Sequence, residues 1–150
     1  MQMREILDSG DAVRLAELLA GEPGLATARM ERSCDHPGGT SPLGYVAMLR
    51  YDTSRGEWRD VTGTGELARA LLAAGAPVDA LDGMFSASPL VWAVEGWRNQ
   101  KHAGADHVGV ARSLIAAGSS LAWSPPEGAP SPEGTLERLA ELVQAAKRGA

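Results

Sequence analysis

The sequence predicts an all-α fold built from repeated helix-turn-helix units, and three observations support this prediction. First, a helix-start signal, Ser-Pro-Leu before small apolar residues, begins at Ser41 and recurs 47 residues later at Ser88. Serine caps the free amide groups of a first turn, and proline in that turn loses no hydrogen bond. Second, a helix-ending segment, Leu-Leu-Ala-Ala-Gly, closes at Gly75, and a near copy closes 43 residues later at Gly118. Third, the segments between these signals carry apolar residues at helical spacing.

The first unit, about residues 1–39, is expected to contain two helices and an extended loop. Residues 2–8 form a short helix, and Asp11 caps a second helix over about 12–20. The predicted apolar stripe of the second helix consists of Val13, Leu15, Leu18 and Leu19. Residues 25–39 show no sustained period and end in a turn signal, His-Pro-Gly-Gly.

The second unit, about residues 40–83, begins with the helix at Ser41. A polar, turn-rich segment follows at 51–64. A second helix is predicted over 66–74, because leucines recur at helical spacing and Gly75 provides the stop.

The third unit, about residues 84–123, repeats this order. A helix is expected from Ser88 to about Trp97, and residues 98–105 are polar and contain glycine. Asp106 then caps a second helix that ends before Gly118.

The remaining residues, 124–150, are predicted to be a linker and a capping helix. Residues 124–134 are rich in proline. The final helix, about 132–148, has acidic residues early and ends in Lys147 and Arg148, an order that suits the helix dipole. One amphipathic helix at the end of a repeat array is typical of a cap.

Composition narrows the class of protein. The formal net charge is −5, which argues against a surface for nucleic acid or an anionic membrane. A length of 150 residues suits one domain, and no apolar run is long enough to span a bilayer. The lone cysteine, Cys34, forms no internal disulfide, so we expect a soluble cytoplasmic protein.

The ordered recurrence of these segments resembles the ankyrin repeat family. The residues that carry the resemblance are Ser41-Pro42-Leu43 with Val46-Ala47, Leu71-Leu72 with Gly75-Ala76 and Val78-Asp79, and their counterparts Ser88-Pro89-Leu90, Leu114-Ile115 and Gly118. The first unit matches in part, and the resemblance covers roughly residues 4–122. It implies a solenoid of about three repeats whose inner helices and hairpin tips form a concave face.

The chain departs from the family pattern in two ways. The histidine that usually follows Pro-Leu is replaced by Gly44 and Val91. The turn between the two helices of a unit is expanded at 51–64 and again at 98–105, which would turn an open surface into a cleft. Since Trp, Tyr and Arg dominate binding hot spots, we expect a binding surface made of nine residues. They are Tyr45, Met48, Arg55, Trp58, Arg59, Trp92, Glu95, Trp97 and Arg98.

These features predict a non-catalytic module that binds a protein segment on its concave face, with the insertions adding specific contacts. Hairpin tips around 35–39 and 79–85 would contribute. The alternative is a small-molecule or enzymatic cleft between the insertions and the hairpins. A homodimer that uses the same concave face is a third possibility, so the chain is expected to be a monomer or a homodimer.

No motif specifies chemistry. His102, Asp106 and His107 are too generic for a metal-ligand set, and His107 suits a structural role at a helix start. Cys34 and His36 are too close in sequence for a nucleophile–base pair. The sequence therefore predicts no catalytic residue, no metal and no cofactor.

Overall fold

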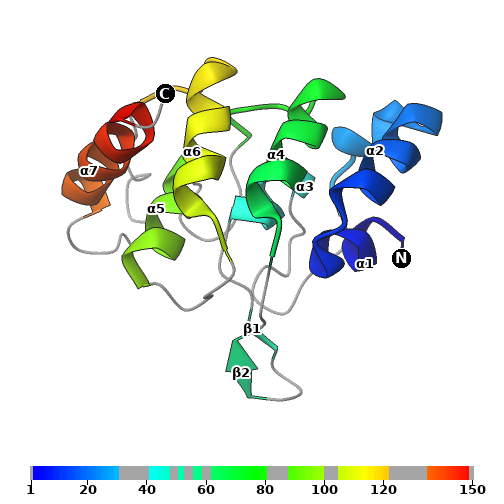
Figure 1. The fold of residues 1–150 in the computed structure, drawn as a ribbon, viewed down its shortest axis with the longest axis horizontal. Coiled ribbons are helices and arrows are strands. Elements are labelled where there is room, and N and C mark those ends of the chain that lie inside the picture. Colours follow the sequence, from blue (N-terminus) through cyan, green and yellow to red (C-terminus); the bar gives the residue numbers. More distant parts are fainter. Residues whose placement is uncertain are drawn as a thin grey trace.

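The computed structural model describes eight segments of the chain. They are residues 2–30, 41–47, 51–52, 56–58, 62–80, 88–99, 105–121 and 135–148. Within these segments the fold is all-α, with seven α-helices, one short 3₁₀ helix and a pair of two-residue strands (Figure 1). The elements in chain order are α1 (Gln2–Ser9), α2 (Ala12–Gly21), η1 (Pro23–Ala26), α3 (Pro42–Ala47), β1 (Tyr51–Asp52), β2 (Glu57–Trp58), α4 (Thr64–Ala73), α5 (Pro89–Asn99), α6 (His107–Ala116) and α7 (Thr135–Arg148).

The helices pack as successive pairs in two layers. Helix α1 packs on α2, α3 on α4, and α5 on α6. Helices α2, α4 and α6 stand side by side in one layer, and the contacts from α1 to α3 and from α3 to α5 form the other (Figure 1). Helix α7 packs on both α5 and α6 and closes the end of the row. The predicted helix pairs and final helix are therefore present.

The predicted caps hold the helix starts. The Asp11 carboxylate accepts a hydrogen bond from the Arg14 amide at 3.0 Å, and the Asp106 carboxylate accepts one from the Gly109 amide at 2.9 Å. The Ser41 hydroxyl accepts one from the Gly44 amide at 3.1 Å. Each bond satisfies an amide that the first turn of a helix leaves without a partner.

The helix ends at Gly75 and Gly118 have the same geometry. Both glycines have a positive φ, 95° and 94°, which residues with a Cβ rarely adopt. The amide after each glycine donates to the carbonyl five residues back, from Ala76 to Leu71 and from Ser119 to Leu114, each at 3.0 Å. This is the Schellman arrangement that the two similar sequence segments predict.

All seven α-helices contribute buried side chains to the core. Among the described residues, eight leucines are completely buried: Leu7, Leu15, Leu43, Leu67, Leu71, Leu90, Leu114 and Leu142. Within the described segments, no helix is both long and apolar enough to cross a bilayer.

Two local predictions were wrong in detail. Val13 is 71% exposed, because it lies about 160° around the helix from Leu15 and so faces away from the stripe of Leu15 and Leu19. Helix α5 extends to Asn99 and takes the first two residues of the expected 98–105 loop. The expected start of the last helix, at about 132, lies outside the described segments, which include α7 from Thr135.

Candidate functional site

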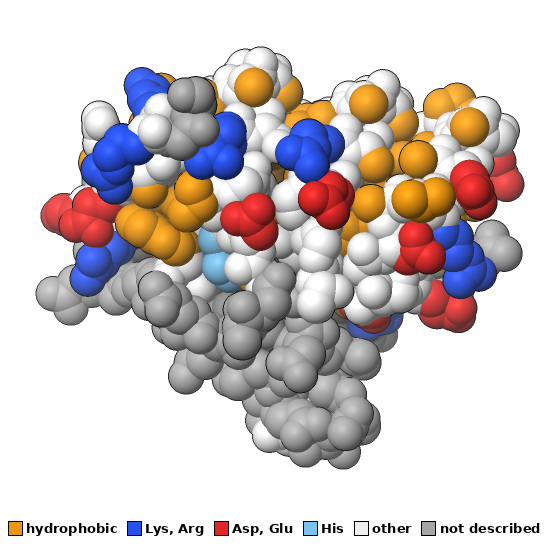
Figure 2. All heavy atoms as spheres, in the orientation of Figure 1, with side chains coloured by type: hydrophobic (Ala, Val, Ile, Leu, Met, Phe, Trp, Pro, Cys, Tyr) orange, Lys and Arg blue, Asp and Glu red, His pale blue; other side chains and the backbone are white. Residues whose placement is uncertain are grey.

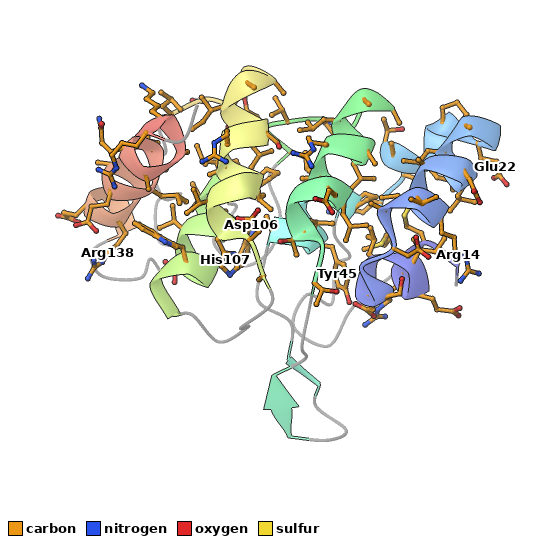
Figure 3. All side chains as sticks on the ribbon, viewed as in Figure 1. Arg14, Glu22, Tyr45, Asp106, His107 and Arg138 are labelled. Atoms are coloured by element: carbon orange, nitrogen blue, oxygen red, sulfur yellow. The ribbon has the colours of Figure 1, made fainter. Side chains whose placement is uncertain are left out.

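The starts of the three helices α2, α4 and α6 lie along one edge of the molecule, from which both insertions enter the fold. We call this the helix-start edge and define it by Gly10–Asp11, Thr62–Thr64 and Ala105–His107. The segment from α3 to α4 reaches the edge at Thr62, and the segment from α5 to α6 reaches it at Ala105. Figure 3 shows Asp106 and His107 at this end of α6, beside α4.

A hydrogen bond joins the ends of the two insertions. The backbone amide of Asp106 donates to the Thr64 hydroxyl oxygen at 2.8 Å. Thr64 is 1% exposed, whereas Asp106 is exposed, so the bond is partly buried. The segments that lead into α4 and α6 therefore lie side by side where these helices begin, although Thr64 and Asp106 are 42 residues apart in the chain. Sequence reasoning did not single out Thr64, although Gly63-Thr64 before an apolar run is a helix-start signal.

The first unit touches the second at the same edge. Gly10 and Gly63 both have positive φ values, 77° and 64°. A Cβ on Gly63 would lie 2.6 Å from the Gly10 carbonyl oxygen, and a Cβ on Gly10 would lie 2.6 Å from the Thr62 carbonyl oxygen. Glycine is needed at both positions, since the two backbones approach too closely for any side chain.

The insertion between α3 and α4 contains a β-hairpin. Strands β1 and β2 pair antiparallel, with Tyr51 opposite Trp58 and Asp52 opposite Glu57. The hairpin projects from the helix-start edge, beyond the layers of helices (Figure 1). The sequence did not predict these strands, because residues 51–64 lack the apolar–polar alternation by which strands are recognised.

The opposite ends of α4 and α6 are tied by Asp79. Its carboxylate accepts hydrogen bonds from the Ser119 hydroxyl at 3.2 Å and from the Ser120 amide at 3.1 Å. Together with the bond from Asp106 to Thr64, these contacts fix α4 and α6 as parallel neighbours. Asp79, expected in a partner-binding hairpin tip, instead links two units; residues 35–39 and 81–85 of the expected tips lie outside the described segments.

Tyr45 is part of a contact between α1 and α3. Its side chain is 3% exposed, and its hydroxyl donates to the Asp8 carboxylate at 2.7 Å (Figure 3). The Arg4 guanidinium lies 5.9 Å from the centre of the ring, within the range of a cation–π contact. Tyr45 was expected to face a cleft, whereas in the structure it joins the first two units.

The other expected binding residues are spread over several elements. Trp92 of α5 is 7% exposed and belongs to the core, whereas Glu95 and Trp97 are partly buried. Trp58 lies in β2 and Arg98 in the last turn of α5. Met48, Arg55 and Arg59 lie outside the described segments. Every described residue from Ser41 to Ala47 and from Ser88 to Val94 is buried, so these stretches present no open helix face.

His107 occupies a structural position at the start of α6. Its side chain is 7% exposed, and its ring lies directly against the backbone of Gly96 on α5. Among the described residues, no group of three or more His, Cys, Asp or Glu side chains could hold a metal ion.

The arrangement as a whole offers an edge at which two insertions meet and a hairpin projects. Loops that are held by a rigid scaffold often carry binding residues. An edge of this kind can bind the surface of another molecule, because the insertions determine its shape and the helix starts determine its position. Comparison of the chain with protein-family models, with curated proteins and with solved structures found no match.

Proposed function

We propose that this chain is an ankyrin-type repeat protein that binds another protein and catalyses no reaction. The repeat assignment is supported by the paired helices in two layers and by the equal geometry of the ends at Gly75 and Gly118. The recurrence of Ser-Pro-Leu at Ser41 and Ser88 in the sequence supports it further.

The observation that carries the binding proposal is the hydrogen bond from the Asp106 amide to the Thr64 hydroxyl. It brings the ends of both insertions together, so that one partner can touch both at once. The hairpin adds a projecting element in which Tyr51 stands opposite Trp58. Trp and Tyr are among the residue types that supply most of the binding energy at protein interfaces.

The partner surface is the helix-start edge with its hairpin. The inner helices contribute little to it, since Tyr45 and Trp92 are buried. The binding face proposed here is therefore the insertion side of the molecule, and the inner helices serve as its support.

Site-specific photo-crosslinking in the cells that naturally make the protein tests this proposal. A photoreactive amino acid replaces Glu57 in the hairpin or, as the control, Glu137 on the exposed side of α7. We expect a discrete adduct from position 57 and none from position 137. Equal adducts from both positions would contradict the proposal.

Affinity measurements with the captured protein then test the mechanism. Trp58→Ala should weaken binding at least about tenfold, the effect expected of a hot-spot residue. Thr64→Val should weaken binding as well, because it removes the acceptor that holds the two insertions together, whereas Thr64→Ser should retain affinity. Unchanged affinity in both Trp58→Ala and Thr64→Val would place the partner elsewhere.

A further inference from the structure

The outer layer of helices has an exposed face with a regular distribution of charge. Counted from the residue that precedes each helix, Gly63 of α4 and Asp106 of α6 are equivalent. Arg69 and Arg112, each six residues further on, are then equivalent too. Because α4 and α6 are parallel neighbours, equivalent residues lie at the same level of the layer.

Acidic and basic side chains lie at different levels of this face. Glu66 and Asp106 are near the helix starts, whereas Arg69 and Arg112 are near the middle, and all four are exposed. Figure 2 shows acidic side chains nearer the helix starts, and basic side chains farther along, over the two central helices.

The rest of the face is small and smooth. Apart from these charges, the fully exposed residues of α4 and α6 are alanines, Ala73 and Ala116. Helix α2, by contrast, exposes the charged Arg14 and Glu17 beside Val13, Ala16 and Ala20. Alanine loses no side-chain rotamer freedom when it is buried, so covering such a face carries a low entropic cost.

We infer that this face binds a second copy of the chain, in a symmetric dimer. The two-fold axis lies in the plane of the face, perpendicular to α4, and passes between Glu66 and Arg69. Rotation about this axis exchanges the two levels, so Glu66 of each copy meets Arg69 of the other.

Charge complementarity favours a second copy of the chain as the molecule that covers this face, and it favours this orientation. A two-fold axis parallel to the helices would place arginine against arginine, which like-charge repulsion disfavours. A symmetric interface must use one patch twice, and a patch with two levels of opposite charge is complementary to its own rotated copy. In the single chain, Glu66 and Arg69 form an exposed pair at 3.4 Å that contributes little stability, so exchanging it for contacts between copies costs little.

This dimer is independent of the proposed function. Its contacts are those of Glu66 and Arg69 on the outer face of α4, whereas the partner surface is the helix-start edge with its hairpin. The two surfaces can be occupied together, and a failure of one proposal leaves the other standing.

Light scattering coupled to size-exclusion chromatography tests the dimer, at chain concentrations between about 5 and 500 µM. The wild-type mass should rise from 15.7 kDa toward twice that value with concentration. Arg69→Glu places Glu66 against a glutamate of the other copy, and it should raise the dimer dissociation constant at least about tenfold. The matched control is Arg138→Glu on α7, which alters another exposed pair of the same spacing and should leave the constant unchanged.

Exchanging the two charges within one chain gives the most direct test of the proposed contact between Glu66 and Arg69. The double variant Glu66→Arg with Arg69→Glu restores opposite charges across the proposed axis, so it should dimerise with itself. Mixed with wild type it should give no heterodimer in native mass spectrometry, because like charges then meet at both levels. A wild-type chain that stays monomeric at all concentrations overturns the proposal, as does a dimer that Arg69→Glu leaves intact or Arg138→Glu dissociates.

Discussion

Gly96 of α5 lies directly against the ring of His107 of α6. A Cβ on Gly96 would lie 2.6 Å from the Nδ1 atom of His107 and closer still to Cε1. Because the histidine ring is buried, it has little room to move aside. Gly96 therefore determines where the ring of His107 lies, and with it how close α5 and α6 approach.

Gly96→Ala should consequently destabilise the protein by about 1–3 kcal/mol, the usual cost of an added methyl group in a filled core. Gly21→Ala is the control, since nothing lies within 4 Å of a Cβ built there and Gly21 is an exposed residue at the end of α2. That substitution should be neutral or slightly stabilising. Urea unfolding followed by circular dichroism measures both, and equal stability of the two variants would contradict the assigned role of Gly96.

The sequence predicts those interactions whose two residues are close together in the chain. Asp11, Ser41 and Asp106 were identified as caps, because a cap acts on an amide three residues away. The links from Tyr45 to Asp8 and from Asp79 to Ser120 were not predicted, since each joins residues far apart in the chain. The burial of Tyr45 and Trp92 was missed for the same reason.

Among the elements, α7 depends on a contact with α6. The Arg112 guanidinium donates from Nε to the Ala146 carbonyl at 3.1 Å. Ala146 belongs to the last turn of α7, whose carbonyls lack partners within the helix. A positive charge at this end also suits the helix dipole. Arg112 thus holds the end of the closing helix.

Arg112→Met keeps most of the apolar stem but removes the donor and the charge. In dilute solution we expect a loss of about 1 kcal/mol and faster amide exchange in the last turn of α7. Arg138→Met on α7 is the control, because its exposed pair with Glu141 should contribute at most about 0.5 kcal/mol. Hydrogen–deuterium exchange with mass spectrometry distinguishes them. Unchanged exchange at 143–148 in Arg112→Met would show that the bond is unimportant.

Helices were easier to predict than strands in this chain. Periodic apolar residues and glycine stops gave α2, α4 and α6 to within about two residues. Strands β1 and β2 were missed, because each is two residues long and neither carries a period. The position of the helix-start edge could be predicted in part, since the repeat places both insertions on one side, but its hydrogen bond could not.

In the whole molecule each helix pair packs mainly on its neighbours in the row. Stability in such an array is close to a sum of unit terms and interface terms, so a lesion acts according to its position. Leu67 lies in the middle of the row and Leu142 at its end, and both are completely buried. Substitutions at these two positions therefore test whether a loss of packing destabilises only the neighbouring helix pairs.

Leu67→Ala and Leu142→Ala should each cost about 2–5 kcal/mol where they act. For Leu142→Ala, amide exchange should quicken in α7 and α6 while α1 and α2 stay protected. For Leu67→Ala, exchange should quicken on both sides of α4. Hydrogen–deuterium exchange resolved by peptide measures the pattern, and uniform loss of protection in Leu142→Ala would indicate a single indivisible core.

The two edges of the row differ in how much change they can absorb. At the ends of α4 and α6, Gly75 and Gly118 share one geometry, and Asp79 links the two units by hydrogen bonds. An added residue there would therefore disturb the spacing of the helix pairs along the row. At the other edge, segments of unequal length already lead into the starts of α4 and α6, which differ in their caps: Gly63 has a positive φ, and Asp106 caps with its side chain. A foreign loop grafted ahead of Gly63 should therefore change the proposed partner surface while the spacing of the helix pairs stays the same.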